Sequence, residues 1–130
     1  MEEALLNYLR SYASLTALIA SRSFWVVLPQ GYVQPYLLLS VISSIPDTTF
    51  DGESGLTQSR IQFDAYSLSY LTSKNIGRAI QTRLGGKIFT NMGIMFRCFK
   101  DSERDTFETV ATPDKLFRNS LDFLIWHKGV

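Results

Sequence analysis

Hydrophobic and polar residues alternate most regularly over residues 58–66. A period of two is typical of a β-strand with one buried face. The apolar face carries Ile61, Phe63 and Ala65, and the polar face carries Arg60, Gln62 and Asp64. The pattern therefore predicts a strand whose polar face meets either solvent or another polar surface.

The period changes directly after this strand. Apolar residues then recur at roughly helical spacing from Leu71 to Leu84, and two glycines end the run. Ser69 is the expected N-cap, because its hydroxyl can accept a free N–H group of the first turn. Gly85 or Gly86 can adopt the left-handed conformation that closes a helix. A strand followed by a helix that packs back on it forms the predicted nucleus of the fold.

Weaker patterns precede this nucleus. Residues 2–10 predict a helix with a leucine stripe, and a second short helical turn follows with Ser14 as its cap. Residues 24–28 and 36–43 predict two strands, separated by a turn at residues 29–31. The second strand is apolar on both faces, which indicates a central or covered position.

Residues 44–56 are rich in turn formers and poor in apolar side chains. Their position between two strands predicts the tip of a long hairpin that projects from the body. A connection of about a dozen residues exceeds the usual hairpin length and is often functional. Two interpretations stay open: a floppy surface loop, or an arm that reaches a neighbouring subunit or a channel.

The remaining residues complete a sheet. Residues 85–91 predict a loop, 93–100 a strand with Cys98 as a small core residue, and 106–110 either its extension or a further edge strand. A turn at 111–114 leads to the last strand, 116–127. The expected fold is a single α+β domain over residues 1–130, with one mixed or antiparallel sheet, helices packed on one face and a projecting β-hairpin.

Composition narrows the class of protein. The chain has 130 residues, a formal net charge of +1 and one cysteine. This balance weakens any claim of broad electrostatic nucleic-acid binding. A single cysteine forms no internal disulfide. The start is acidic, unlike a signal peptide, and the apolar runs are too short to cross a bilayer, so we expect no membrane association and synthesis in a cytosol.

The sequence offers no catalytic set, metal site or cofactor site. The only histidine, His127, lies near the chain end, where we expect a solvated side chain. The segment from Gly85 to Lys87 lacks the earlier glycine and the Ser or Thr of a phosphate loop. Asp101, Glu103 and Asp105 share a face if the segment is a regular strand; a solvated charged edge is a better interpretation than a cation site. Asp122 alternates in the same way on the last strand, and a buried aspartate needs hydrogen-bond partners, which favours an interface.

Several short motifs occur in a fixed order and together cover residues 3–126. They are Arg22-x-Phe24, Leu28-Pro29-Gln30-Gly31, Pro35-Tyr36, Asp51-Gly52-x-Ser54-Gly55-Leu56, Arg60-x-Gln62-x-Asp64-x-Tyr66, a capped helix, Asp101-x-Glu103-Arg104-Asp105 and Asp122-Phe123-x-x-Trp126-His127. The ordered set resembles the tail-completion or tail-terminator family of long-tailed bacteriophages and related prophages. Leu68 and Tyr70 depart from the small residues expected near the helix start, and Gly77 inside the helix suggests a close subunit contact.

The resemblance implies a structural role in the virion. Members of such families form a ring, typically of six subunits, at the head-proximal end of the tail tube. The ring ends tube polymerisation and offers a docking face to the head connector or stopper. Genomic DNA passes through the bore without sequence-specific recognition, and assembly takes place in the host cytoplasm.

We therefore expect the hairpin around residues 45–56 to reach the bore or the adjacent subunit. Acidic side chains there would keep DNA from adhering as it slides. The candidate interface or channel residues are Asp47, Thr48, Phe50, Asp51, Glu53, Arg60, Gln62 and Asp64. The alternatives are a head-side connector or stopper, a tail tube subunit and, from a different class, a small cytosolic ligand-binding domain or enzyme.

Overall fold

The structure, a computed structural model, describes residues 1–31, 33–49, 52–111 and 114–129. Three helices and six strands follow one another along the chain. They are α1 (Glu2–Arg10), α2 (Ala13–Ile19), β1 (Ser23–Trp25), β2 (Tyr36–Thr49), β3 (Gly52–Ser67), α3 (Tyr70–Leu84), β4 (Ile88–Asn91), β5 (Ile94–Ala111) and β6 (Asp114–Gly129).

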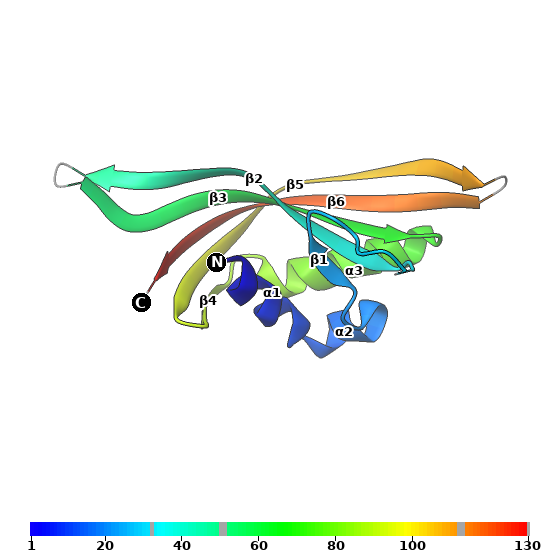
Figure 1. Cartoon of the computed structure of the whole chain (residues 1–130), viewed down its shortest axis with the longest axis horizontal. Helices are drawn as coiled ribbons and strands as arrows, with labels where there is room; N and C mark the ends of the chain where they lie inside the picture. The colour runs from blue at the N-terminus through cyan, green and yellow to red at the C-terminus, as the bar shows by residue number, and fades with distance from the viewer. Residues whose placement is uncertain (32, 50–51, 112–113, 130) are drawn as a thin grey trace.

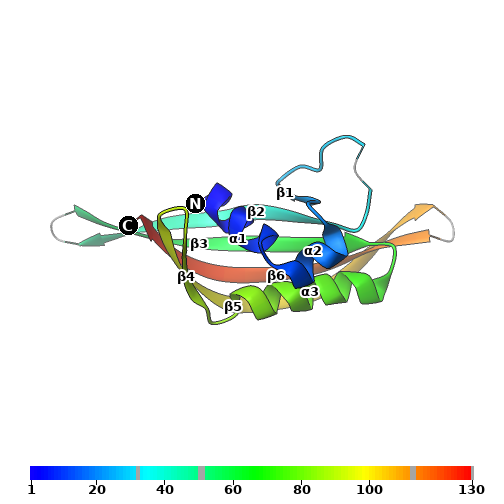
Figure 2. The ribbon, with the colours of Figure 1, turned by 90° about the horizontal axis from the view of Figure 1, so that it is seen from below.

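The strands form one mixed sheet in the order β1-β2-β3-β6-β5-β4. β1 is parallel to β2, and every other neighbouring pair is antiparallel. All three helices lie on one face of the sheet (Figure 2), which we call the covered face; the opposite one is the open face. The predicted fold class, an α+β domain with helices on one side, is confirmed.

The alternation in the sequence decides which side chains reach the core. Ile61, Phe63 and Ala65 on β3 are at most 1% exposed, as are the matching residues of the neighbouring strands. Those are Leu37, Leu39, Leu121, Phe123, Ile125, Phe96 and Cys98. Phe63 and Phe123 meet edge to face at 5.5 Å between ring centroids, a geometry that adds about 1 kcal/mol beyond burial. Burial also raises the pKa of the Cys98 thiol to about 12, so this cysteine is a core residue as predicted.

Helix α3 begins and ends where the sequence predicted. The Ser69 side chain accepts a hydrogen bond from the Thr72 N–H group, and Gly86 follows the helix with a φ of 67°. Gly77 is buried, and a Cβ atom there would overlap Asn119 Oδ1 of β6. The expected subunit contact at Gly77 is therefore wrong: glycine is needed for packing within the chain.

The loop predicted for residues 85–91 contains strand β4. Phe89 stacks on Tyr8 of α1 at 3.5 Å and on Phe96 of β5 at 4.9 Å between ring centroids. The Arg83 guanidinium lies 3.7 Å from the centroid of the Tyr8 ring. This stack joins elements that are far apart in the sequence, and a four-residue strand carries too short a pattern to reveal it.

Two N-terminal predictions are wrong in detail. α2 begins at Ala13 after Tyr12, whose side chain forms no capping hydrogen bond, so Ser14 lies inside the helix instead of capping it. The strand predicted over residues 24–28 ends at Trp25, because the Val26 backbone turns to a φ of 66°. The chain leaves the sheet there, and Val26 and Val27 are exposed.

Two hairpins extend past the helices at opposite ends of the molecule (Figure 1). The β2–β3 ladder continues to the pair Thr49–Gly52, with one irregularity between the pairs Pro46–Thr57 and Thr48–Glu53, so residues 44–49 and 52–56 belong to strands. The projecting hairpin is confirmed, whereas the connection of about a dozen residues is wrong. We call this extension the β2–β3 arm.

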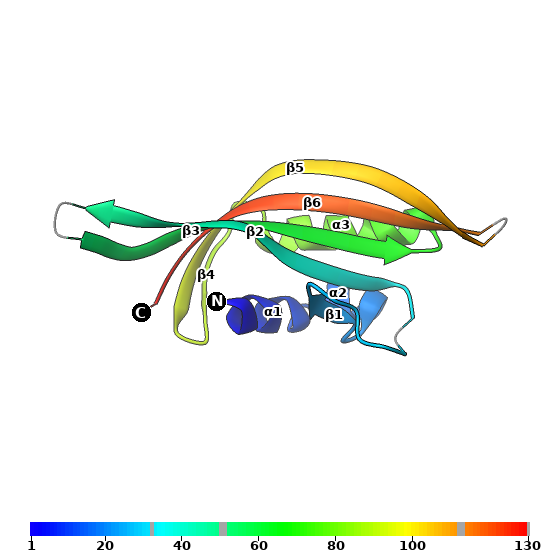
Figure 3. The ribbon, with the colours of Figure 1, turned by 45° about the horizontal axis from the view of Figure 1, so that its top comes forward.

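The second hairpin is formed by β5 and β6, whose ladder continues to the pair Ala111–Asp114. We call the part beyond Asp105 the β5–β6 arm; Figure 3 shows it opposite the first. The sequence left open whether residues 106–110 extend the strand, and they do. The sequence did not reveal this continuity, because a run of charged residues such as 101–105 usually indicates the end of a strand.

Candidate assembly surfaces

The polar residues of β3 lie on the open face and are bonded to one another and to β6. Asp64 is 7% exposed and accepts a hydrogen bond of 2.6 Å from the Ser120 hydroxyl. The Gln62 amide donates to both Asp64 oxygens at 3.0 Å. Arg60 donates to Asp101 and lies 3.7 Å from Asp122. The sequence left open whether the polar face of this strand meets solvent or another polar surface. In the structure, the polar residues of β3 bond to polar residues of β5 and β6.

A β-bulge on β5 completes this group. The register shifts between the pairs Lys100–Phe123 and Ser102–Asp122, so Asp101 is an extra residue. It turns towards Arg60 on the open face, while Glu103 lies on the covered face. The predicted common face for Asp101, Glu103 and Asp105 is therefore wrong, because a bulge reverses the alternation. We call Arg60, Gln62, Asp64, Asp101, Arg104, Ser120 and Asp122 the polar strip.

Opposite charges within the polar strip neutralise one another. Arg104 lies 3.5 Å from Asp122, which also accepts a hydrogen bond of 3.4 Å from Ser102. Arg60 is shared between Asp101 and Asp122. The strip presents hydrogen-bonding groups to solvent but little uncompensated charge.

The other two carboxylates of this segment, Glu103 and Asp105, bond to α3 and β6 on the covered face. Lys74 of α3 lies 3.1 Å from Glu103 and 3.0 Å from Asp105, and the Asn119 amide donates to both. The hydrogen bond from Asn119, with those from Lys74 and Lys100, holds the pKa of Glu103 down to about 2. Among the described residues, no group of three or more His, Cys, Asp or Glu side chains is placed to hold a metal ion.

His127 is half-buried, not solvated as the sequence suggested. Its Nε2 atom lies 2.8 Å from the Ser59 hydroxyl, which is 3.2 Å from the Ser44 hydroxyl. Burial lowers the pKa of His127 below its usual value. Ser59 is 0% exposed, so its hydroxyl is closed to a substrate. The contact joins β2, β3 and β6 where the β2–β3 arm leaves the body.

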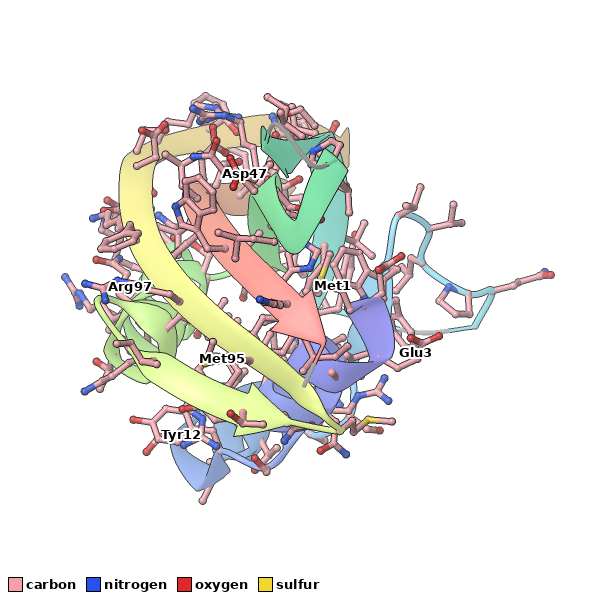
Figure 4. All side chains as sticks on the ribbon, turned by 90° about the vertical axis from the view of Figure 1, so that its left-hand side faces the viewer. Met1, Glu3, Tyr12, Asp47, Met95 and Arg97 are labelled. Atoms are coloured by element: carbon pink, nitrogen blue, oxygen red, sulfur yellow. The ribbon has the colours of Figure 1, made fainter. Side chains whose placement is uncertain are left out.

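An apolar hollow lies on the open face beyond the polar strip. It has a volume of about 530 Å³ and is lined by Leu56, Ile88, Met95, Phe96, Arg97, Phe99 and Trp126. Three of its side chains are well exposed: Ile88 at 62%, Met95 at 41% and Phe99 at 39%. Figure 4 shows Met95 and Arg97 on β5 at this end of the molecule, near the arm that carries Asp47.

Three of the predicted arm residues, Asp47, Thr48 and Glu53, lie near the tip of the β2–β3 arm. Asp47 is exposed, and Thr48 pairs with Glu53 in the backbone ladder. Phe50 and Asp51 lie outside the described residues. The structure separates this tip from the polar strip, so the candidate residues that it describes form two groups.

Sequence reasoning missed two surface features. Phe107 on the β5–β6 arm is 58% exposed, and the apolar hollow gathers residues from β3, β4, β5 and β6. A long strand with period-two alternation through residues 94–110 would have been the signal for the arm, but the bulge at Asp101 breaks it. The hollow has no signal in any one segment.

These features are typical of one class of protein: a structural protein that contacts its partners through extended strands and exposed apolar side chains. Within the part of the chain that the structure describes, no helix is long and apolar enough to span a membrane. The chain belongs to the family described as Tail completion protein gp17, which it matches over residues 3–128. It is therefore a structural protein of a phage-type virion tail.

Solved structures agree on the fold. A chain from the virion of a native gene transfer agent particle superposes with a TM-score of 0.80 at 17% identity, covering 99% of this chain and 95% of its own. A second solved chain has a TM-score of 0.54 at 12% identity, over 96% of this chain and 95% of its own. The search of curated protein sequences found no significant match.

Proposed function

We propose that this protein forms a ring at the head-proximal end of the tail, ends polymerisation of the tube and joins the tail to the head connector. The observation that carries the proposal is the pair of arms at opposite ends of one sheet (Figure 1). A subunit with different contacts at its two ends repeats head to tail, and such contacts close into a ring when the rotation between neighbours allows it.

The edges of the sheet support repeated contacts. β1 covers β2 only at Leu37–Leu39, and β4 covers β5 only at Ile94–Arg97. Beyond these pairs, no described strand pairs with the outer edge of either arm. Open edges readily accept another chain, while Pro46 on β2 and the charges on β5 restrict which partner fits.

The bore of such a ring would carry DNA without holding it. The polar strip supports this, because Arg60 and Arg104 already face Asp101 and Asp122 and offer little free positive charge to phosphate. Asp47 and Glu53 of the β2–β3 arm, with Asp51 between them in the sequence, would repel DNA if the arm reaches the channel. A chain of similar fold comes from the virion of a gene transfer agent particle, which supports a role in a virion.

Electron microscopy tests the ring. Tails assembled without the protein should be overlong or irregular in length and should fail to join heads. Adding the purified chain should cap one end of each tube with a ring. Long cylinders formed by the chain alone would identify a tube subunit instead, and binding to heads without binding to tails would identify a head-side connector.

The role of the β2–β3 arm has its own test. Deletion of residues 47–55, closed with a two-residue turn, should leave thermal unfolding of the isolated chain nearly unchanged, because the described part of the arm extends past the helices (Figure 1). The same variant should lose ring formation and infectivity. Infective particles that contain the shortened chain would contradict the proposed reach of the arm.

A further inference from the structure

The β2–β3 arm begins where the sheet narrows to two strands. β6 pairs with β3 as far as the rung Leu56–Lys128, and the β2–β3 ladder continues beyond that rung. Figure 1 shows the end of β6 turning away from the arm at this point. We call residues 43–46 of β2, with residues 57–60 of β3 opposite them, the arm root.

The backbone of β2 is irregular on both sides of the arm root. The register shifts between Val41 and Ser43 and again between Pro46 and Thr48. Pro46 has no N–H group and cannot donate a ladder hydrogen bond. Register shifts bend a strand and interrupt its ladder, so the arm root is built as a hinge.

Side chains link three strands at this hinge. His127 Nε2 of β6 lies 2.8 Å from the Ser59 hydroxyl of β3, which is 3.2 Å from the Ser44 hydroxyl of β2. Ser59 is 0% exposed, so water does not replace the imidazole as its partner. The imidazole therefore fastens the arm root to the last rungs of β6.

The surroundings of His127 disfavour its protonated form. Burial of the half-buried ring is the main reason that the pKa of His127 lies below its ordinary value of 6.5, and the positive amino group of Met1 in α1 acts in the same direction. The Glu2 carboxylate of α1 acts in the opposite direction. The neighbouring strands present two uncharged hydroxyls and the Phe96 ring, whose centroid is 6.2 Å away.

Acid therefore acts on the arm root through this ring. A histidine with a lowered folded pKa stabilises the fold while it is neutral, and this contribution is lost as the pH falls below the unfolded pKa of about 6.5. Moving the charged ring into water avoids the cost of burying it. The same movement breaks the side-chain link between Ser59 and β6.

We propose that His127 is a pH-sensitive anchor of the β2–β3 arm: the neutral ring holds the arm root to β6, and the protonated ring releases it. The anchor itself is a property of the free chain. Its effect on assembly rests on the proposed function, in which this arm reaches the bore or the adjacent subunit.

An NMR titration of the free chain tests the anchor. His127 is the only histidine, so its imidazole signals are identified by residue type alone. Its pKa should lie below the ordinary value of 6.5, and the amide signals of residues 44–49 should shift with the same midpoint. A pKa at or above the ordinary value, or arm amides that do not respond, would overturn the inference.

Hydrogen exchange measures whether the arm is released. After correction for intrinsic exchange rates, protection of the β2–β3 arm should fall at least about threefold between about pH 7 and about pH 5.5. The β5–β6 arm contains no histidine and should keep its protection, so it is the internal control. An equal fall in both arms would mean general loosening and would contradict the anchor.

Two variants separate the charge from the hydrogen bond. The amide of His127→Gln still bonds to the Ser59 hydroxyl but gains no proton, so arm protection should no longer depend on pH in this range. Ser59→Ala removes the partner of the ring and should lower arm protection already at neutral pH. Circular dichroism checks the fold of both variants. A His127→Gln chain with the full wild-type pH dependence would refute the anchor.

Assembly on tails separates this inference from the proposed function. The wild-type chain should need a higher concentration to form rings at the lower pH, as counted by electron microscopy, whereas His127→Gln should need the same concentration at both. Wild-type rings that form equally well at both pH values would overturn the pH control and leave the proposed function standing. A wild-type chain that forms no ring at neutral pH would overturn the proposed function, and the NMR titration would still decide the anchor.

Discussion

Gly77 shows how one atom sets the distance between a helix and a sheet. A methyl group at this position would overlap Asn119 Oδ1, which lies on β6 below α3. Asn119 in turn donates to Glu103 and Asp105, so the glycine fixes both the helix and a polar cluster.

We expect Gly77→Ala to destabilise the fold by about 1–3 kcal/mol, although alanine favours a helix by about 1 kcal/mol. Urea unfolding followed by circular dichroism measures the loss. The control is Thr82→Ala on the exposed side of the same helix, which should change stability by less than about 0.5 kcal/mol. A stabilised Gly77→Ala variant would show that the contact with Asn119 relaxes freely.

Glu103 should make the free energy of unfolding depend on pH in the acidic range. Its folded pKa is lowered from 4.5 to about 2 by Asn119, Lys74 and Lys100. A lowered carboxyl pKa stabilises the fold above the unfolded pKa, and this contribution disappears as the pH falls through the folded pKa. Stability should therefore decline between about pH 5 and pH 2.

Glu103→Gln should flatten that decline, as measured by thermal unfolding at a series of pH values. Glu108→Gln is the matched control, because Glu108 is exposed on the same strand. The interpretation would be wrong if both variants kept the full wild-type slope.

Helix α3 is the element that the sequence specified most completely. Ser69 accepts a hydrogen bond from the Thr72 N–H group, and the buried stripe Ile76, Ile80 and Leu84 faces the sheet. Ser69→Ala should cost about 1 kcal/mol of unfolding free energy, and Ser69→Asp should retain most of it, because aspartate also caps. Equal losses in both variants would mean that the hydroxyl acts in some other way.

At the scale of the whole molecule, stability should be uneven. The body is held by a sheet packed under three helices, while each arm ends in a hairpin that extends past them (Figure 1). Two-stranded hairpins are marginally stable alone in water. Amides of both arms should therefore exchange with deuterium much faster than those of the central β3–β6 ladder.

Assembly should reverse this difference. In rings on tails, exchange of the β2–β3 arm, which is proposed to reach the bore or the next subunit, should slow, as followed by mass spectrometry. Helix α2, which has no part in the proposed contact, serves as the internal reference. Equally fast exchange of this arm in the ring and in the free chain would contradict its proposed role.

The sequence by itself determined the sheet, its covered face and α3. Alternation at Ile61, Phe63 and Ala65, and again at Phe96 and Cys98, fixes which side is buried, because a strand has only two faces. The cap at Ser69 and the glycines after Leu84 fix the helix ends through local backbone hydrogen bonds. The resemblance to tail-completion proteins, which rests on short motifs in a fixed sequence order, is also confirmed.

Tertiary structure alone decided the second arm, strand β4 and the apolar hollow. The bulge at Asp101 reverses the alternation of β5, and only its pairing with β6 shows that the strand continues. Phe89 forms a strand because Tyr8 and Phe96 lie on either side of it, eighty-one residues and seven residues away in the chain. Such contacts depend on where distant segments meet, which no local pattern of residues specifies.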